Sequence, residues 1–130
     1  MKNLGLQMVF NESSAIVYDK HTISKTIGSP ASVEFDFDAA WDYMKTLQPF
    51  DPELLHFIHI HPPSFNTYSD TDVRCMKALN MAFGYSVNFW IVYQNLITYS
   101  AVCYQYHNSE VTRKKDCEKL ADFIIGRILV

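Results

Sequence analysis

The chain has 130 residues, of which 48% are hydrophobic and 19% charged, and its formal net charge is −3. The length fits one domain with its own hydrophobic core, and the composition excludes a disordered, collagen-like or low-complexity chain. The acidic balance argues against nucleic acid as a partner, because binding to phosphate backbones usually needs a basic surface.

Apolar and β-branched runs predict strands near the amino terminus. The segments Leu4–Phe10 and Ala15–Tyr18 have this character, and Val33–Phe37 alternates apolar and acidic residues with the period of a half-buried strand. The polar segment between them, His21–Ser32, carries the sequence Gly-Ser-Pro, which predicts a turn.

A helix is predicted over Ala39–Leu47, with Asp38 as its N-cap. Trp41, Met44 and Leu47 follow helical spacing and are expected to face the core. The segment Pro49–Pro52 ends this helix, because proline fits poorly inside one.

The middle of the chain predicts a strand followed by a helix. Leu54–His61 is an apolar strand that Pro62 must end, because proline cannot donate to a strand ladder. Asp70–Phe83 has helical periodicity, and Gly84 stands at the usual C-terminal position. The residues expected to face inward are Val73, Met76, Leu79 and Met81 or Ala82.

The last third predicts a hairpin and a closing helix. Strands over Val87–Tyr93 and Leu96–Tyr106 are joined by Gln94-Asn95, and a helix runs from Val111 to Ile128. Strands mixed with helices, together with an antiparallel hairpin, predict an α+β fold in a single domain over residues 1–130. We expect a mixed β-sheet flanked by helices.

Targeting signals and cysteine usage favour a cytoplasmic protein. No apolar run approaches the ~18 residues of a membrane span, so we expect no membrane partner. The opening MKNLGLQMVFNESS has no long apolar stretch and no small-residue cleavage site, and we interpret it as mature protein. Cys75, Cys103 and Cys117 are an odd number, far apart, with no CxxC pair, which is typical of reduced cysteines.

One stretch, HIHPPSFNTYSDTD from His59 to Asp72, carries the chemistry. Residues two apart in a strand share a face, so His59 and His61 point the same way, about 7 Å apart at the backbone. Asp72 falls in the first turn of the next helix and could supply a third ligand. Two nitrogens and one oxygen suit a catalytic zinc ion that keeps a fourth position for water.

Structural interpretations stand beside this one. Two histidines that alternate with isoleucines could form the solvated face of a half-buried strand. Ser69 and Asp72 also fit the start of a helix, with the serine as N-cap and the acid at the third position. The capping and metal-ligand interpretations of Asp72 are compatible, because a capped helix would hold Asp72 rigidly near the histidines.

The motif HxH, then seven residues that begin with Pro62, then serine, two residues and aspartate resembles the signature of the JAMM (MPN+/JAB-domain) zinc metalloproteases, with the family spacing intact. The resemblance implies a JAB/MPN-like fold with cytidine-deaminase-like layering. It implies His59, His61 and Asp72 as zinc ligands. It also implies that Ser69 stabilises the oxyanion of a tetrahedral intermediate.

The family also uses an upstream glutamate as general base. The candidates are Glu12, Glu34 and Glu53. Glu12 precedes an apolar strand, as in the family pattern, and is our choice. Glu34 lies in the segment VEFDF, which resembles a later strand of the family, the one before the helix. Glu53 stands in a proline-flanked loop and is too near the motif in the sequence. The glycine that usually follows the family's glutamate is absent, and Ala15 stands near that place.

The resemblance implies a zinc-dependent peptidase or isopeptidase whose substrate is a protein or peptide, with a ubiquitin-like conjugate as one candidate. The alternative is a non-catalytic MPN-like interaction scaffold. A zinc nucleobase deaminase ranks low, because it needs H-x-E and P-C-x-x-C, and the sequence has neither. The other histidines, His21, His56 and His107, lack spaced partners and are expected at the surface or in loops.

Overall fold

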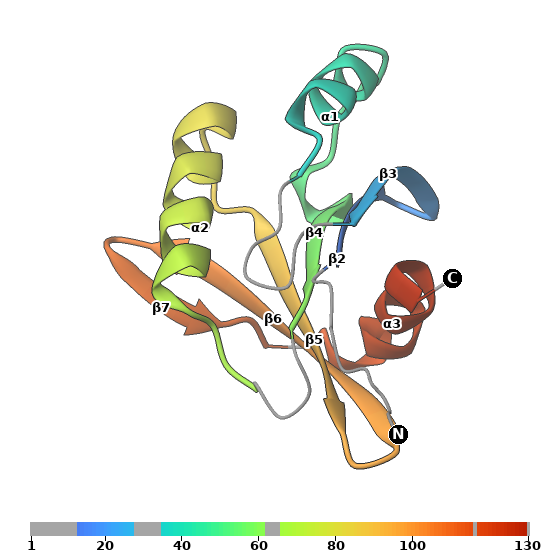
Figure 1. Cartoon of the computed structure of the whole chain (residues 1–130). Helices are drawn as coiled ribbons and strands as arrows, with labels where there is room; N and C mark the ends of the chain where they lie inside the picture. Colours follow the sequence, from blue (N-terminus) through green and yellow to red (C-terminus); the bar gives the residue numbers. More distant parts are fainter. Residues whose placement is uncertain (1–12, 28–34, 62–65, 116, 130) are drawn as a thin grey trace.

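The structure is a computed structural model of the chain and describes residues 13–27, 35–61, 66–115 and 117–129. These residues form an α+β fold in which one six-stranded mixed sheet is accompanied by three α-helices (Figure 1). The strand order in the sheet is β3-β2-β4-β5-β6-β7. The predicted fold class is therefore confirmed at the level of a mixed sheet with helices.

The strands are β2 (Ser13–Tyr18), β3 (His21–Ile27), β4 (Leu55–Ile60), β5 (Asn88–Asn95), β6 (Thr98–His107) and β7 (Glu110–Arg113). The α-helices are α1 (Phe37–Met44), α2 (Asp70–Phe83) and α3 (Ala121–Leu129), and two short 3₁₀ turns are η1 (Pro52–Leu54) and η2 (Glu118–Leu120). Within this described part, no helix combines the length and apolar character needed to span a bilayer.

Strand β4 lies near the middle of the sheet, between one antiparallel and one parallel neighbour. It pairs antiparallel with β2, where Ser14 stands opposite His59. It pairs parallel with β5, where Ile91 stands opposite His59. Helix α2 lies between the two parallel strands in the chain, and it is the next element after the carboxyl end of β4.

The two faces of β4 enter two separate cores. Leu55 and Phe57 pack on the side of α1 and α2, whereas Ile58 and Ile60 pack on the side of α3. Figure 1 shows α2 and α3 on opposite sides of the sheet. All six residues of β4 are buried, and each large apolar side chain buried in this way contributes roughly 1.5–3 kcal/mol. The strand is therefore a rigid support for whatever its carboxyl end carries.

Helix α2 begins and ends where its sequence predicts. Ser69 is the N-cap and forms a capping box with Asp72, and Gly84 ends the helix with a positive φ of 80°. Met76 and Leu79 are buried, as expected. The expectation for Met81 or Ala82 is wrong, because both are exposed, Met81 to 78%.

The region before α1 differs from the prediction. Residues 21–27 form strand β3, although their polar character predicts only a turn, because they pair with β2 along its length. Phe35 and Asp36 are not in a strand, and α1 begins at Phe37 because the Asp36 side chain accepts a hydrogen bond from the Ala39 N–H at 3.0 Å. Trp41 is 47% exposed and does not face the core as expected.

The carboxyl third also departs from expectation. The β5–β6 ladder extends to Asn95 and Thr98, so the hairpin turns at Leu96-Ile97 and not at Gln94-Asn95. The predicted helix over 111–128 is wrong in its first part, because Asn108 and Ser109 both have positive φ and turn the chain back along β6 as β7. The predicted strand Leu4–Phe10 lies outside the described residues.

His56 is buried, and the prediction of a surface or loop position is wrong. Its side chain faces the α3 side of β4, and Nδ1 accepts a hydrogen bond from Trp90 Nε1 at 2.9 Å. Burial, with Lys114 nearby, lowers the pKa of His56 to about 4. The imidazole is therefore neutral in the folded protein near pH 7.

We expect this histidine to make folding stability depend on pH. Its folded pKa lies below the unfolded value of about 6.5, so the unfolded chain binds more protons between these two values. The free energy of unfolding should be highest above pH 6.5 and fall by about 3 kcal/mol as the pH drops to 4. Urea titrations of the wild type and of His56→Gln measure this, and parallel pH profiles of the two proteins would contradict it.

Candidate metal centre

The end of β4 and the start of α2 bring three chemically active side chains together. His59 is on β4, and His61 follows the strand on the same face, where its backbone N–H donates to Val92 O at 2.8 Å. This bond continues the parallel ladder past the last assigned residue of β4 and fixes the position of His61. Asp72, the third residue of α2, meets both rings.

The three side chains are close together and buried. His59 Nδ1 lies 2.9 Å from Asp72 Oδ1, and His61 Nε2 lies 2.9 Å from Asp72 Oδ2. The two imidazole rings are 4.6 Å apart at their centroids and nearly perpendicular, at 84°. His59, His61 and Asp72 are 5%, 3% and 2% exposed. Each carboxylate oxygen is thus paired with a different imidazole.

Ser69 connects the capping of α2 to this cluster. The Ser69 hydroxyl donates to Asp72 Oδ2 at 3.0 Å and accepts from the Asp72 N–H at 3.2 Å. The Ser69 N–H also donates to Asp72 Oδ2, at 2.8 Å. The capping interpretation of the Ser69 and Asp72 spacing is therefore confirmed, and it coexists with the cluster.

These contacts control the charge of the carboxyl group. Burial by itself opposes ionisation of Asp72, but hydrogen bonds from His59 and His61, with a further one from the Ser69 backbone, outweigh it. Together they hold the pKa of Asp72 well below its usual value. Asp72 is therefore an ionised carboxylate, the form that can bind a cation.

The donor set fits a divalent metal ion. One ligand atom from each of His59, His61 and Asp72 lies within 4.8 Å of the other two. Ligands of one zinc ion stand about 2 Å from it, so a shift of about 1 Å in a side chain brings these atoms to bonding distance. Cys75, one helical turn further along α2, is no competing thiolate, because burial, with Asp72 nearby, raises its pKa to about 12.

The three candidate glutamates fare differently. Glu12 and Glu34 lie outside the described residues. Glu53 is in η1, before the amino end of β4, and forms an ion pair with Lys114. Five residues, four of them in the extended strand β4, separate it from His59, roughly 15 Å along the chain. Glu53 therefore does not belong to the metal centre.

Two tyrosines on the face of the sheet that carries the histidines, Tyr93 and Tyr104, were not predicted from the sequence. Tyr93 lies two residues beyond Ile91 on β5, and so on the face of the sheet that carries the two histidines. Tyr104 packs edge to face with Tyr68, with ring centroids 5.0 Å apart. The alternation of β5 and β6 is the signal that could have found them, once the register of these strands against β4 was known.

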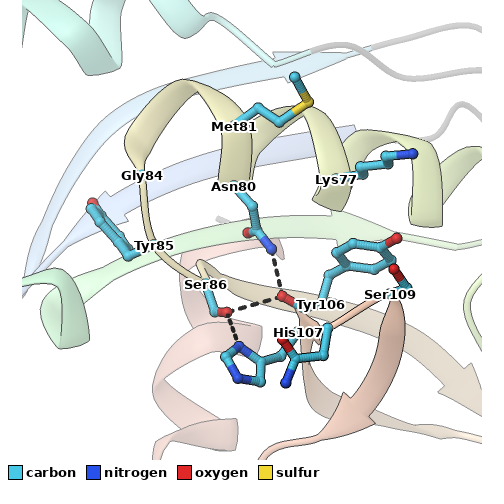
Figure 2. Close-up of a pocket in the computed structure, with 10 residues that line it drawn as sticks. Lys77, Asn80, Met81, Gly84, Tyr85, Ser86, Tyr106, His107 and Ser109 are labelled. Carbon is cyan, nitrogen blue, oxygen red and sulfur yellow. Dashed lines mark hydrogen bonds between the residues drawn. The ribbon is translucent and has the colours of Figure 1, made fainter.

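A hollow elsewhere in the described part of the chain is lined by groups that hydrogen-bond to one another. Its volume is about 560 Å³, and it lies between the end of α2 and the β6–β7 turn (Figure 2). Ser86 Oγ is 3.4 Å from His107 Nδ1, but its hydroxyl donates to Tyr106 O at 2.9 Å. Asn80 also donates to Tyr106 O. These bonds fasten α2 and the start of β5 to β6, and Ser86 is not arranged as a nucleophile.

The sequence matches no protein-family model, and no curated protein is significantly similar to it. Function is therefore inferred from the chemistry of the metal centre and from the motif that supplies it.

We expect the wild-type protein to bind one zinc ion per chain, and His59→Ala and Asp72→Ala to lose it. Removing one of three protein ligands should weaken binding by at least about 100-fold. Zinc content after dialysis, and the zinc-induced rise in Tm, measure this. His56→Gln is the matched control, because that histidine lies on the same strand but faces away, and it should retain zinc. Metal retained in both ligand variants would remove the centre from consideration.

Proposed function

We propose that this protein is a zinc-dependent peptidase or isopeptidase of the JAMM type. The observation that carries the proposal is the buried meeting of His59, His61 and Asp72. These are the three positions that the motif implies as zinc ligands. The substrate is a protein or peptide, with a ubiquitin-like conjugate among the candidates, and the cytoplasm is the expected compartment.

The architecture supports a JAB/MPN-like fold. The histidines stand at the carboxyl end of a central strand, and the aspartate stands in the first turn of the helix that follows. After the motif come α2, the β5–β6 hairpin, strand β7 and helix α3. In the family that the motif resembles, a helix, a β-hairpin and a last helix also follow the motif. The two sides of the sheet are covered by different helices, in layers.

Zinc would supply Lewis-acid chemistry and lower the pKa of a coordinated water to about 7. The protein must hold the ion in place and leave one side open to substrate. His59, His61 and Asp72 would occupy three positions, and rigid packing of β4 and α2 would keep them there. A fourth position then remains for water or substrate.

Glu12 is the proposed general base, on the strength of the motif's resemblance. It precedes an apolar strand, as the glutamate of the family does. The described part of that strand, β2, pairs with β4, where Ser14 stands opposite His59. The Glu12 carboxylate would take a proton from the attacking water and pass it to the leaving amine.

Ser69 is the proposed donor to the substrate oxyanion. Its hydroxyl already lies at the edge of the centre, where it donates to Asp72 Oδ2. A hydroxyl can rotate, so the same group can turn from the carboxylate to a carbonyl oxygen as negative charge develops there. The Ser69 backbone N–H would continue to hold Asp72.

We expect Glu12→Gln to retain zinc and lose hydrolysis, because the amide cannot accept the proton. The decrease in kcat should be at least about 100-fold. Zinc-loaded wild type and variant are compared on a mixture of fluorescence-quenched peptides and on a ubiquitin dimer. Glu53→Gln is the control and should remain active, because Glu53 lies at the other end of β4. Full activity in Glu12→Gln would show that another group is the base.

The same measurements test the scaffold alternative. Wild-type protein that binds zinc at the centre but cleaves none of these substrates would favour a non-catalytic MPN-like scaffold.

We expect Ser69→Ala to lower kcat about 100-fold with little change in KM, because the hydroxyl would act mainly in the transition state. Loss of the N-cap should also reduce the free energy of unfolding by about 1 kcal/mol. Ser69→Thr retains the hydroxyl and should recover most of both. Steady-state kinetics and urea denaturation separate the two effects, and equal kcat in Ser69→Ala and wild type would exclude the oxyanion role.

A further inference from the structure

Helices α1 and α2 enclose an apolar groove on the outer surface of the protein. The groove has a volume of about 300 Å³. Its lining includes Phe37, Trp41, Ala78, Ala82 and Phe83. Its lining comes from α1 and from the second half of α2, whereas Asp72 is in the first turn of α2, so the groove is separate from the metal centre. We propose that this groove is a docking site for a basic amphipathic helix of another protein.

Two aromatic side chains leave much of their surface in water. Phe37 is 46% exposed and Trp41 47% exposed. Trp41 packs against Phe83, with ring centroids 5.5 Å apart, so it is held in place at the groove and does not move freely. Exposed apolar surface that is gathered in a hollow, and not scattered, is typical of a binding site for an apolar partner.

The side of the groove formed by α2 is shaped for close approach. Ala78 and Ala82 are one helical turn apart, and both are exposed. Their small side chains would let the axis of a partner helix approach to about 8 Å, the short end of normal helix packing. An apolar stripe on the partner could then insert between these alanines and the aromatic rings of α1, as helices dock into grooves elsewhere.

The charges around the groove indicate which kind of partner helix it would bind. Asp36, Asp38 and Asp42 are all exposed on or just before α1, and Asp38 lines the groove itself. Within the described residues of α1 and its C-cap, Lys45 is the cation that offsets them, at 3.6 Å from Asp42. On the α2 side, Arg74 lies one turn before Ala78 and hydrogen-bonds Thr71. The α1 rim is therefore acidic, which favours lysines or arginines on the partner and disfavours an acidic helix or an anionic surface.

The probe is a synthetic peptide of about 18 residues with leucines at helical spacing on one face and lysines elsewhere, without tryptophan. A second peptide has the same leucines with glutamates in place of the lysines. Trp41 reports binding directly, because the chain has 2 tryptophans and the other, Trp90, is 1% exposed. Covering Trp41 should shift its emission to shorter wavelength.

We expect the basic peptide to bind at least about tenfold more tightly than the acidic one. Ala82→Arg should weaken binding of the basic peptide by at least about tenfold, because it fills the groove and adds positive charge. Thr112→Arg, an exposed position on β7, is the matched control and should bind like the wild type. Circular dichroism and Tm check that both variants fold.

The acidic rim is tested in the same way. Asp38→Asn should weaken binding of the basic peptide and reduce its dependence on salt. Asp122→Asn is the matched control, because Asp122 occupies the first turn of α3, as Asp38 does in α1. Binding of the basic peptide should be unaffected by His59→Ala, because the groove is separate from the metal centre. Equal affinity for the two peptides, unchanged affinity in Ala82→Arg, or concealment of Trp41 in a dimer of the wild type would overturn the proposal.

Discussion

The carboxylate of Asp72, enclosed between two imidazole rings, is the interaction on which the site depends. A buried negative charge is costly unless donors surround it. Here His59 and His61 each face one oxygen, and Ser69 donates from both its backbone and its side chain. The strand and the helix are therefore fastened to each other through the same atoms that would bind a cation.

This arrangement joins folding to function. The Asp72 contact with the Ser69 backbone is half of a capping box, so the start of α2 and the orientation of the carboxylate are set together. A bound ion would replace the hydrogen bonds between the rings and the carboxylate, while the Ser69 N–H would still orient the carboxylate, as outer contacts do in metal sites. The site is thus preorganised by ordinary helix capping.

What could be predicted from sequence was local. The alternation of β4, the cap at Ser69 and the stop at Gly84 are short-range signals, and the first two placed His59, His61 and Asp72 on their strand and helix. The failures depend on distant partners. Strand β3 forms because β2 offers it an edge, and His56 is buried because Trp90 supplies a donor from the neighbouring strand. No pattern within a segment contains that information.

The two ends of β4 differ in a way that bears on function. At the amino end, Asn88 bonds to backbone carbonyls of residues 53 and 55, and Lys114 reaches both Asn88 and Glu53. Donors and acceptors of several kinds match there, as in a structural network. At the carboxyl end, the side chains that meet are two imidazoles and a carboxylate, all of them metal ligands by type. Because ligand sites in sheets with parallel strands favour carboxyl ends, this end of β4 is where chemistry is expected.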